Sequence, residues 1–343
     1  MADLTIMGAG IFGLALAYSC AQRGARVRVI EKRAPGAGSS GGLVGALAPH
    51  VPENWNTKKA FQLKALRMAG DFWRGVAECS GQDPGYARLG RVQPVAADKL
   101  DLAQARAVQA QELWQGLAQW RVLRAGDAPG LPVVAPSGWV VHDTLTARLH
   151  PRQASRALLG ALQHLGVTVE TGDTPPAGTV VWATGHEGLA ELSRDLGREI
   201  GSGVKGQSLA LALHCTDAPQ IFADGLHIVP HFDGTVAIGS TSERDFDDPC
   251  STDARCDALL AQARDICPAL RDAPELCRWA GVRPRAKSRA PLLGGWPGRP
   301  GHFVFNGGFK IGFAMAPALA ALMADLVLDG QDRVPQEFRL TSP

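Results

Sequence analysis

Several features that would assign this chain to a class at once are absent. The net charge of its 343 residues is only +2, which neither favours nor excludes a nucleic-acid partner. The seven cysteines are an odd number without a CxxC pair, which indicates reduced thiols in a cytoplasmic protein, not a disulfide framework or a zinc site. No basic segment or cleavage site flanks the first strand, and no uninterrupted run of about 18 apolar residues occurs, so we expect neither export nor a membrane span.

What the sequence does contain is the composition of a globular protein, 45% hydrophobic and 20% charged, with enough length for two lobes. The apolar spacing predicts helices at 57–79, 98–120, 151–165, 252–267 and 311–328, and strands at 167–169, 180–183, 208–213, 226–229, 236–240 and 302–306. The interleaving suggests a discontinuous architecture, with a cofactor lobe formed by 1–50, 142–205 and 281–343 and a substrate lobe with helices formed by 51–141 and 206–280.

The strongest motif lies in the first thirteen residues. A strand-like run at 4–7 leads directly into Gly8-Ala9-Gly10-Ile11-Phe12-Gly13, which has the G-x-G-x-x-G spacing. Gly8 permits a tight turn, Gly10 lets the backbone approach a pyrophosphate, and Gly13 allows close packing of helix on strand. The helix start that follows offers free N–H groups and a positive dipole end to phosphates.

An acid ends the second predicted strand. Residues 26–30 are followed by Glu31, eighteen positions beyond Gly13, where a carboxylate can accept hydrogen bonds from a ribose diol. Strand, helix, strand and acid in this order predict a bound adenine dinucleotide. The alternative is a glycine-rich turn in another kind of α/β protein.

Three further segments favour a flavin over a nicotinamide. The first is the Gly/Ser tract 36–42, whose serines can donate hydrogen bonds to a diphosphate, with a thin backbone beyond it to face a flat ring. The second is the end of the strand 180–183, and the third is the turn 307–312, which precedes a helix whose positive end would stabilise a negatively charged reduced flavin. The expected cofactor-binding residues are Gly8, Gly10, Ile11, Phe12, Gly13, Glu31, Lys32, Ser39, Ser40, Val44, Gly45, Ala46, Leu47, Thr184, Gly185, Gly308, Phe309, Lys310, Ile311, Gly312 and Phe313.

With these motifs the chain resembles the D-amino-acid-oxidase-type FAD oxidoreductases over nearly its whole length, and is most similar to glycine oxidase and sarcosine oxidase. The resemblance implies an α/β fold with an α+β second lobe: a Rossmann-like FAD-binding domain of the glutathione-reductase type beside an antiparallel-sheet substrate domain. The motifs that carry it are 8–13, Glu31, 39–40, 45–49, 150–152, 204–207, 228–230, 233–235, 239–241, 279–284 and 306–317.

The family's chemistry implies an activity for the chain. Its members oxidise a carbon–nitrogen bond by passing hydride from the substrate carbon to flavin N5, and the resulting imine is hydrolysed. This needs an unprotonated amine held over the ring. The implied cofactor is FAD, bound non-covalently because no cysteine matches the covalent attachment of sarcosine oxidases. The electron acceptor, O₂ or another, the particular amine and the oligomeric state are left open.

Four residues are expected at the substrate end. Arg283 matches the arginine of the family's Gly-hydrophobic-Arg-Pro motif and would bind the substrate carboxylate, the alternative being an ordinary ion pair between lobes. Lys310 would form a second, looser contact because lysine lacks the planar fork of arginine. His227 would donate a hydrogen bond and titrate near neutral pH, or would simply pack on the sheet, and His50 would line the pocket.

A basic stripe supports a rival function. Arg283, Arg285, Lys287 and Arg289 recur at every second position, which on an extended strand would place them on one face. Such a stripe would suit a larger anion, as in the oxidase half of the tRNA-modifying methylaminomethyl-uridine enzyme, although prolines at both ends of the run favour a solvated turn. A flavin-binding subunit that passes electrons to a partner is the third alternative.

Overall fold

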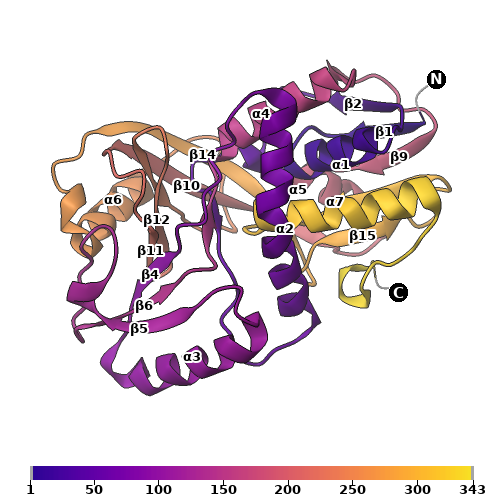
Figure 1. Cartoon of the computed structure of the whole chain (residues 1–343). Helices are drawn as coiled ribbons and strands as arrows, with labels where there is room; N and C mark the ends of the chain where they lie inside the picture. The colour runs from indigo at the N-terminus through magenta and orange to yellow at the C-terminus, as the bar shows by residue number, and fades with distance from the viewer. Residues whose placement is uncertain (1–2, 341–343) are drawn as a thin grey trace.

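The computed structural model describes residues 3–340, and its strands form two large sheets and one small one (Figure 1). The first large sheet has the order β15-β16-β9-β1-β2-β8, in which only β15 runs antiparallel to its neighbour. Its strands are β1 (Leu4–Met7), β2 (Val27–Glu31), β8 (Thr168–Thr171), β9 (Thr179–Trp182), β15 (Leu292–Gly295) and β16 (His302–Asn306).

Helices cover this parallel sheet because crossovers between parallel strands require them. In Figure 1, α1 (Ile11–Gln22) and α7 (Gly312–Asp329) lie next to the sheet, and α2 (Thr57–Ser80) stands at the boundary between the two halves of the molecule. The other helices of this half are α4 (Pro151–His164), which begins with proline at its first position, and α5 (Gly185–Asp195).

By length and composition α7 alone among the described helices could cross a membrane, with a mean hydropathy of 1.5. Half of that segment is buried inside the protein, however, and it belongs to the same hydrophobic core as α1 and α2. Packing within the protein therefore accounts for its apolar residues.

The second large sheet has the order β14-β10-β13-β12-β11-β4-β6-β5 and is antiparallel except where β11 meets β4. Its strands are β4 (Arg91–Pro94), β5 (Trp120–Arg124), β6 (Trp139–Asp143), β10 (Gly201–Ala212), β11 (Gln220–Ala223), β12 (Leu226–Pro230), β13 (Thr235–Gly239) and β14 (Glu275–Ala286). Helix α6 (Ala254–Ile266) packs on β10, β12 and β13, and α3 (Leu100–Trp114) packs on β5.

Short elements complete the fold. The third sheet pairs β3 (Ala46–Leu47) with β7 (Ala147–Arg148), and so fixes the loop after the Gly/Ser tract against the start of α4. The 3₁₀ turns are η1 (Ser39–Gly41), η2 (Ala97–Lys99), η3 (Ala125–Asp127), η4 (Pro268–Leu270) and η5 (Gln336–Phe338).

The structure confirms the predicted mixed fold of parallel and antiparallel sheets but corrects two local predictions. The helix predicted over 98–120 ends at Trp114, because Gln115 and Gly116 adopt left-handed backbone angles (φ 49° and 76°), and β5 begins at Trp120. Pro284 was expected to discourage a strand, yet it lies within β14; β14 is an edge strand, where a missing N–H is tolerated.

The proposed division into two lobes stays a prediction. Three of its boundaries, at 141/142, 205/206 and 280/281, fall inside β6, β10 and β14. The long β10–β14 pair therefore crosses from one predicted lobe into the other.

Candidate active site

A main cavity of about 670 Å³ extends from the carboxyl ends of the parallel strands to β14. This is the edge of an open α/β sheet at which ligands usually bind. Of the predicted cofactor residues, eighteen line this cavity: Gly8, Gly10, Ile11, Phe12, Glu31, Lys32, Ser39, Ser40, Val44, Gly45, Ala46, Thr184, Gly185, Gly308, Phe309, Lys310, Gly312 and Phe313. The loop 172–178 between β8 and β9 also reaches the cavity, through Gly172 and Asp173.

Glycine is required at the start of the cavity by close backbone approaches. Gly8 has φ +103°, and a Cβ there would lie 2.5 Å from the carbonyl oxygen of Ala183. A Cβ on Gly13 would lie 1.8 Å from the carbonyl oxygen of Gly8. Gly13 does not line the cavity, so its role is the predicted close packing of α1 against β1.

Backbone N–H groups hold the acid and the serine of the predicted dinucleotide site. Glu31 accepts hydrogen bonds from the N–H of Ala9 at 2.8 Å and of Arg33 at 3.1 Å. Ser40 was expected to donate to a diphosphate, but its Oγ accepts from the N–H of Ile11 at 2.9 Å. Its hydroxyl hydrogen remains the group that can donate to a phosphate.

The wall that would face the flat ring also consists of backbone, which packs closely against its neighbours. A Cβ on Gly45 would lie 1.6 Å from the carbonyl oxygen of Leu149, whose N–H donates to Gly45 at 2.9 Å. On another part of the wall a Cβ on Gly308 would lie 2.9 Å from the Phe12 ring, which stacks on Phe305. Side chains larger than hydrogen would therefore displace this wall.

Three buried polar atoms on the cavity wall have no hydrogen-bond partner within residues 3–340. They are Thr184 Oγ1, Ser208 Oγ and His227 Nδ1. Leaving such groups unpaired costs about 1–3 kcal/mol each, so their presence indicates that a polar ligand completes them. Together with the glycine contacts and the placement of Glu31, they fit FAD, with the dinucleotide end at β1 and β2 and the ring near Gly45 and Gly308.

Arg283 is buried at the far end of the cavity with 9% of its surface exposed. Its Nη1 donates to the carbonyl oxygen of Thr241 at 3.2 Å, and a Cβ on Gly206 would lie 1.8 Å from Nη1. Burial lowers the pKa of Arg283 to about 10, and the Glu243 carboxylate opposes that shift. The guanidinium therefore remains charged at neutral pH.

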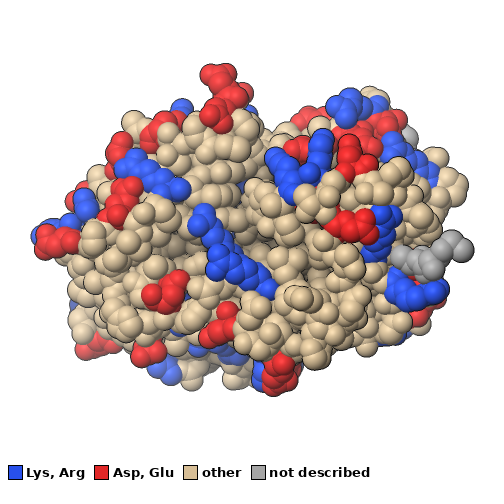
Figure 2. All heavy atoms as spheres, turned by 90° about the horizontal axis from the view of Figure 1, so that it is seen from above, with Lys and Arg blue, Asp and Glu red and all other residues tan. Residues whose placement is uncertain are grey.

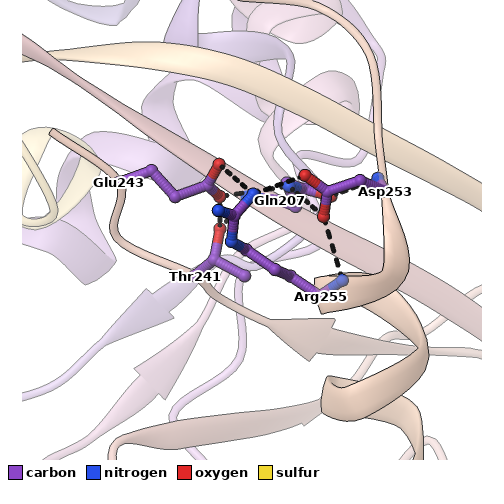
Figure 3. Close-up of polar contacts among 5 residues, drawn as sticks. All are labelled: Gln207, Thr241, Glu243, Asp253 and Arg255. Carbon is purple, nitrogen blue, oxygen red and sulfur yellow. Dashed lines mark hydrogen bonds and ion pairs between the residues drawn. The ribbon is translucent and has the colours of Figure 1, made fainter. Parts of the chain in front are cut away.

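A polar network joins Gln207, Thr241, Glu243, Asp253 and Arg255 (Figure 3), and the carbonyl oxygen of Thr241 links it to Arg283. Gln207 donates to Glu243 at 3.1 Å and to Asp253 at 3.0 Å, while Arg255 forms ion pairs with the same two carboxylates. The Thr241 hydroxyl donates to Glu243, and the N–H of Asp253 donates to Gln207 Oε1 at 2.9 Å. The network thus anchors Thr241, whose carbonyl holds Arg283.

Lys310 is a second cation on the cavity wall. It precedes α7, and its Nζ lies 5.8 Å from the centroid of the Phe309 ring. Burial by the surrounding protein and the charge of Arg283 both lower the pKa of Lys310, although its side chain remains exposed. The two cations therefore share one region of the wall.

His227 lies on the wall, packed against Phe222 with ring centroids 4.6 Å apart. Burial and the charges of Arg91 and Lys310 lower the pKa of His227 to about 3. The prediction that this histidine titrates near neutral pH is therefore wrong, because the site keeps it neutral. Arg91 itself is held by an ion pair with Asp143 at 2.9 Å.

The remaining predicted residues lie elsewhere, and several wall residues were not predicted. His50 is exposed and its backbone N–H donates to Gln62, while Leu47 and Ile311, like His50, are not among the residues that line the cavity. The sequence did not predict four wall residues on or beside the antiparallel sheet, because register and not local spacing brings them together, although two of them, Ser240 and Trp279, stood in quoted motifs. These are Ser208, Phe222, Ser240 and Trp279.

When the molecule is viewed from above relative to Figure 1, its surface has no broad area of only positive or only negative charge. In Figure 2, most Lys and Arg are interspersed with Asp and Glu, one short blue band crosses the middle of the face, and large areas carry neither. This face therefore offers no extended basic track for a nucleic-acid backbone.

Comparison with known proteins agrees with this geometry. The model of the FAD dependent oxidoreductase (DAO) family matches residues 3–326. The glycine oxidase of Pseudomonas aeruginosa is 28% identical over 94% of this chain and 94% of its own. The crystal structure of glycine oxidase from Geobacillus kaustophilus superposes with a TM-score of 0.85 at 24% identity, covering 99% of this chain and 98% of that one, and shows a shared fold.

A third relative bears on the nucleic-acid alternative. The tRNA 5-methylaminomethyl-2-thiouridine biosynthesis bifunctional protein of Marinobacter nauticus is 26% identical over 94% of this chain, which spans 55% of that protein.

Proposed function

The chain belongs to the FAD-dependent oxidoreductase (DAO) family, and we propose that it oxidises the carbon–nitrogen bond of a small carboxylated amine, such as glycine, sarcosine or a D-amino acid. The observation that carries the proposal is the buried, charged Arg283 on the wall of the main cavity. It has one N–H group bound to Thr241 and further donors for a carboxylate.

The residues on the wall supply positioning and electrostatics. When bound, FAD supplies the acceptor for the hydride that leaves the substrate carbon. Arg283 holds the substrate carboxylate, and Lys310 adds a second, more exposed positive charge. Because two cations lie near the substrate, they lower the pKa of its ammonium group and favour the neutral amine that oxidation requires.

His227 has a different role in this account. With a pKa of about 3 it carries no charge at neutral pH, so it does not compete with the cations for the carboxylate. Its unpaired Nδ1 is available for one hydrogen bond to the substrate or to water on the cavity wall.

We also propose non-covalent FAD and a cytoplasmic location. Among the described residues, none of the seven cysteines lines the main cavity, which supports a cofactor held without a thioether bond. All seven are free thiols, as expected in a reducing compartment. Acid precipitation tests the first point, since flavin absorbance in the supernatant supports it and a yellow pellet contradicts it.

The experiment that tests the reaction is anaerobic. Glycine, sarcosine, N-carboxymethyl amines and D-amino acids are added one at a time while the oxidised flavin band near about 450 nm is followed. Bleaching by one of them, with its imine product recovered as a carbonyl compound, supports the proposal. No bleaching by any of them, in a protein whose flavin dithionite reduces, contradicts it and directs attention to tRNA.

A further inference from the structure

A second, smaller pocket lies on the basic stripe. It measures about 230 Å³ and is lined by four cations and one acid: Arg244, Arg285, Lys287, Arg289 and Glu199. Gly201, Ser202 and Ala286 complete its wall. We call this the basic pocket.

The cations of the basic pocket lack the partners that other arginines of this chain have. Arg28 and Arg278, for example, pair with Glu170 and Asp257 at 2.6 and 2.7 Å. Within residues 3–340, the side chains of Arg244, Lys287 and Arg289 form no hydrogen bond or ion pair. Among the described residues, the Arg285 side chain has only a ring contact, in which its guanidinium carbon lies 5.7 Å from the centroid of Phe309.

Four like charges around one small pocket oppose folding unless something neutralises them. Arg244, Lys287 and Arg289 are exposed, so water weakens this repulsion, and salt screens it further beyond the Debye length of about 8–10 Å. One exposed acid, Glu199, does not balance four cations. An anion bound among them would remove the repulsion and accept several charge-assisted hydrogen bonds.

Among the described residues, the basic pocket and the main cavity have no lining residue in common but meet along β14, where Pro284 lines the main cavity and Arg285 lines the basic pocket. On β14, Arg283 and Arg285 are two residues apart, so their side chains lie on the same face, opposite Val204 and Ser202 of β10. Phe309 lines the main cavity, and its ring has Lys310 and Arg285 at similar distances, 5.8 and 5.7 Å. Arg285 thus connects the carboxylate-binding region with the basic pocket.

We propose that the basic pocket binds a second anionic group, a carboxylate or a phosphate, of the same amine whose first carboxylate binds Arg283. This rests on the proposed function and narrows its substrate class to amines with two anionic ends. Two residues along a strand span about 6.6 Å, so a linker of a few bonds separates the two groups.

The first test compares two substrates of equal length. N-carboxymethyl-β-alanine carries a distal carboxylate, and N-propylglycine replaces it with a methyl group. For Arg285→Gln, and for the Arg244→Gln, Lys287→Gln double variant, we expect the ratio of kcat/KM for the first over the second to fall about tenfold. Lys64→Gln, which removes an exposed cation of α2, is the matched control and should keep the wild-type ratio.

A second readout does not depend on turnover. Inorganic phosphate, at ionic strength held constant with chloride, should raise the melting temperature of the wild-type holoenzyme and of Lys64→Gln but not of the double variant. N-carboxymethyl phosphoethanolamine distinguishes a phosphate from a carboxylate as the second anionic group. If the double variant loses more kcat/KM with this amine than with N-carboxymethyl-β-alanine, phosphate is the preferred group.

The outcomes separate this inference from the proposed function. Amines that bleach the flavin, with the same substrate ratio in every variant and no phosphate effect, would overturn the inference and leave the proposed function standing. Binding of tRNA alone, without use of either dianionic amine, would overturn it as well. Absence of any amine oxidation would overturn the proposed function itself.

Discussion

The two ends of the main cavity are built in different ways. At the dinucleotide end, backbone contacts of Gly8 and Gly13 decide the shape, and Glu31 is held by two N–H groups. At the substrate end, a buried cation is held by a carbonyl that a network of side chains supports. The residues of the dinucleotide end lie in a short stretch of the sequence. Those of the substrate end come from distant segments that the register of the sheet brings together. Substitutions at the substrate end should therefore affect amine oxidation, and substitutions at the dinucleotide end should affect FAD binding.

The largest expected effect is at the substrate end. Arg283→Gln removes a buried charge that is matched to the substrate carboxylate, and such losses cost about 2–5 kcal/mol. We expect kcat/KM for a carboxylated amine to fall about 100- to 1,000-fold, mostly through KM. Steady-state kinetics beside the Lys64→Gln control measures this, and an unchanged KM would remove Arg283 from the carboxylate site.

The next effect is at the dinucleotide end. Gly8→Ala places a methyl group 2.5 Å from the carbonyl oxygen of Ala183 at a positive φ, so we expect FAD affinity to fall and the free energy of unfolding to drop by about 2 kcal/mol or more. Gly24→Ala is the matched control, because Gly24 also has a positive φ but no atom of residues 3–340 lies within 4 Å of its Cβ position. Equal losses in both variants would show that backbone angle alone, not the close approach, explains the glycine.

A smaller effect is expected in the side-chain network that supports Arg283 through Thr241. Glu243→Gln keeps the shape of the network but removes the charge that raises the pKa of Arg283. The KM for a carboxylated amine should rise about tenfold or less, and the alkaline limb of the kcat/KM profile, where Arg283 loses its charge, should move to lower pH. Asp257→Asn, which removes an exposed partner of Arg278, is the control. An alkaline limb that stays in place would show that Glu243 does not act on Arg283.

The smallest effect concerns pH. His227 has a pKa of about 3 in the folded protein and about 6.5 when unfolded, so only the unfolded state binds the proton between these values. Its contribution to stability is therefore complete above pH 6.5 and is lost as the pH falls toward 3. Urea unfolding at pH 7.5 and 5.8 should show that His227→Gln loses about 1 kcal/mol less than wild type between the two. Equal losses of unfolding free energy in the two proteins would mean that His227 can be protonated in the folded protein.

Sequence reasoning reached the two ends to different degrees. The order of strand, glycine turn, helix and acid follows from local rules, and the structure places those residues together on one cavity wall. Arg283 and Lys310 were identified only through resemblance to a family, and both line the cavity. The placement of Ser208 and Phe222 was not accessible, because strands far apart in sequence set it.

The same limit applies to the surroundings of single side chains. The neutral state of His227 depends on Arg91, Phe222 and Lys310, none of which lies beside it in the sequence. His50 directly follows the loop that would face the flavin. Its backbone N–H nevertheless donates to Gln62 on α2, and His50 does not line the cavity. Local patterns therefore located the cofactor end, while burial and long-range charge decided the chemistry of the other end.

The most direct test of this division is the affinity of the Arg283→Gln apoprotein for FAD, measured by titration with the cofactor beside wild type. The account predicts dissociation constants within about twofold of each other, even though kcat/KM falls at least about 100-fold, because no contact at the dinucleotide end involves Arg283. A loss of FAD affinity that parallels the loss of activity would contradict it, since Arg283 would then support the cofactor and not the substrate.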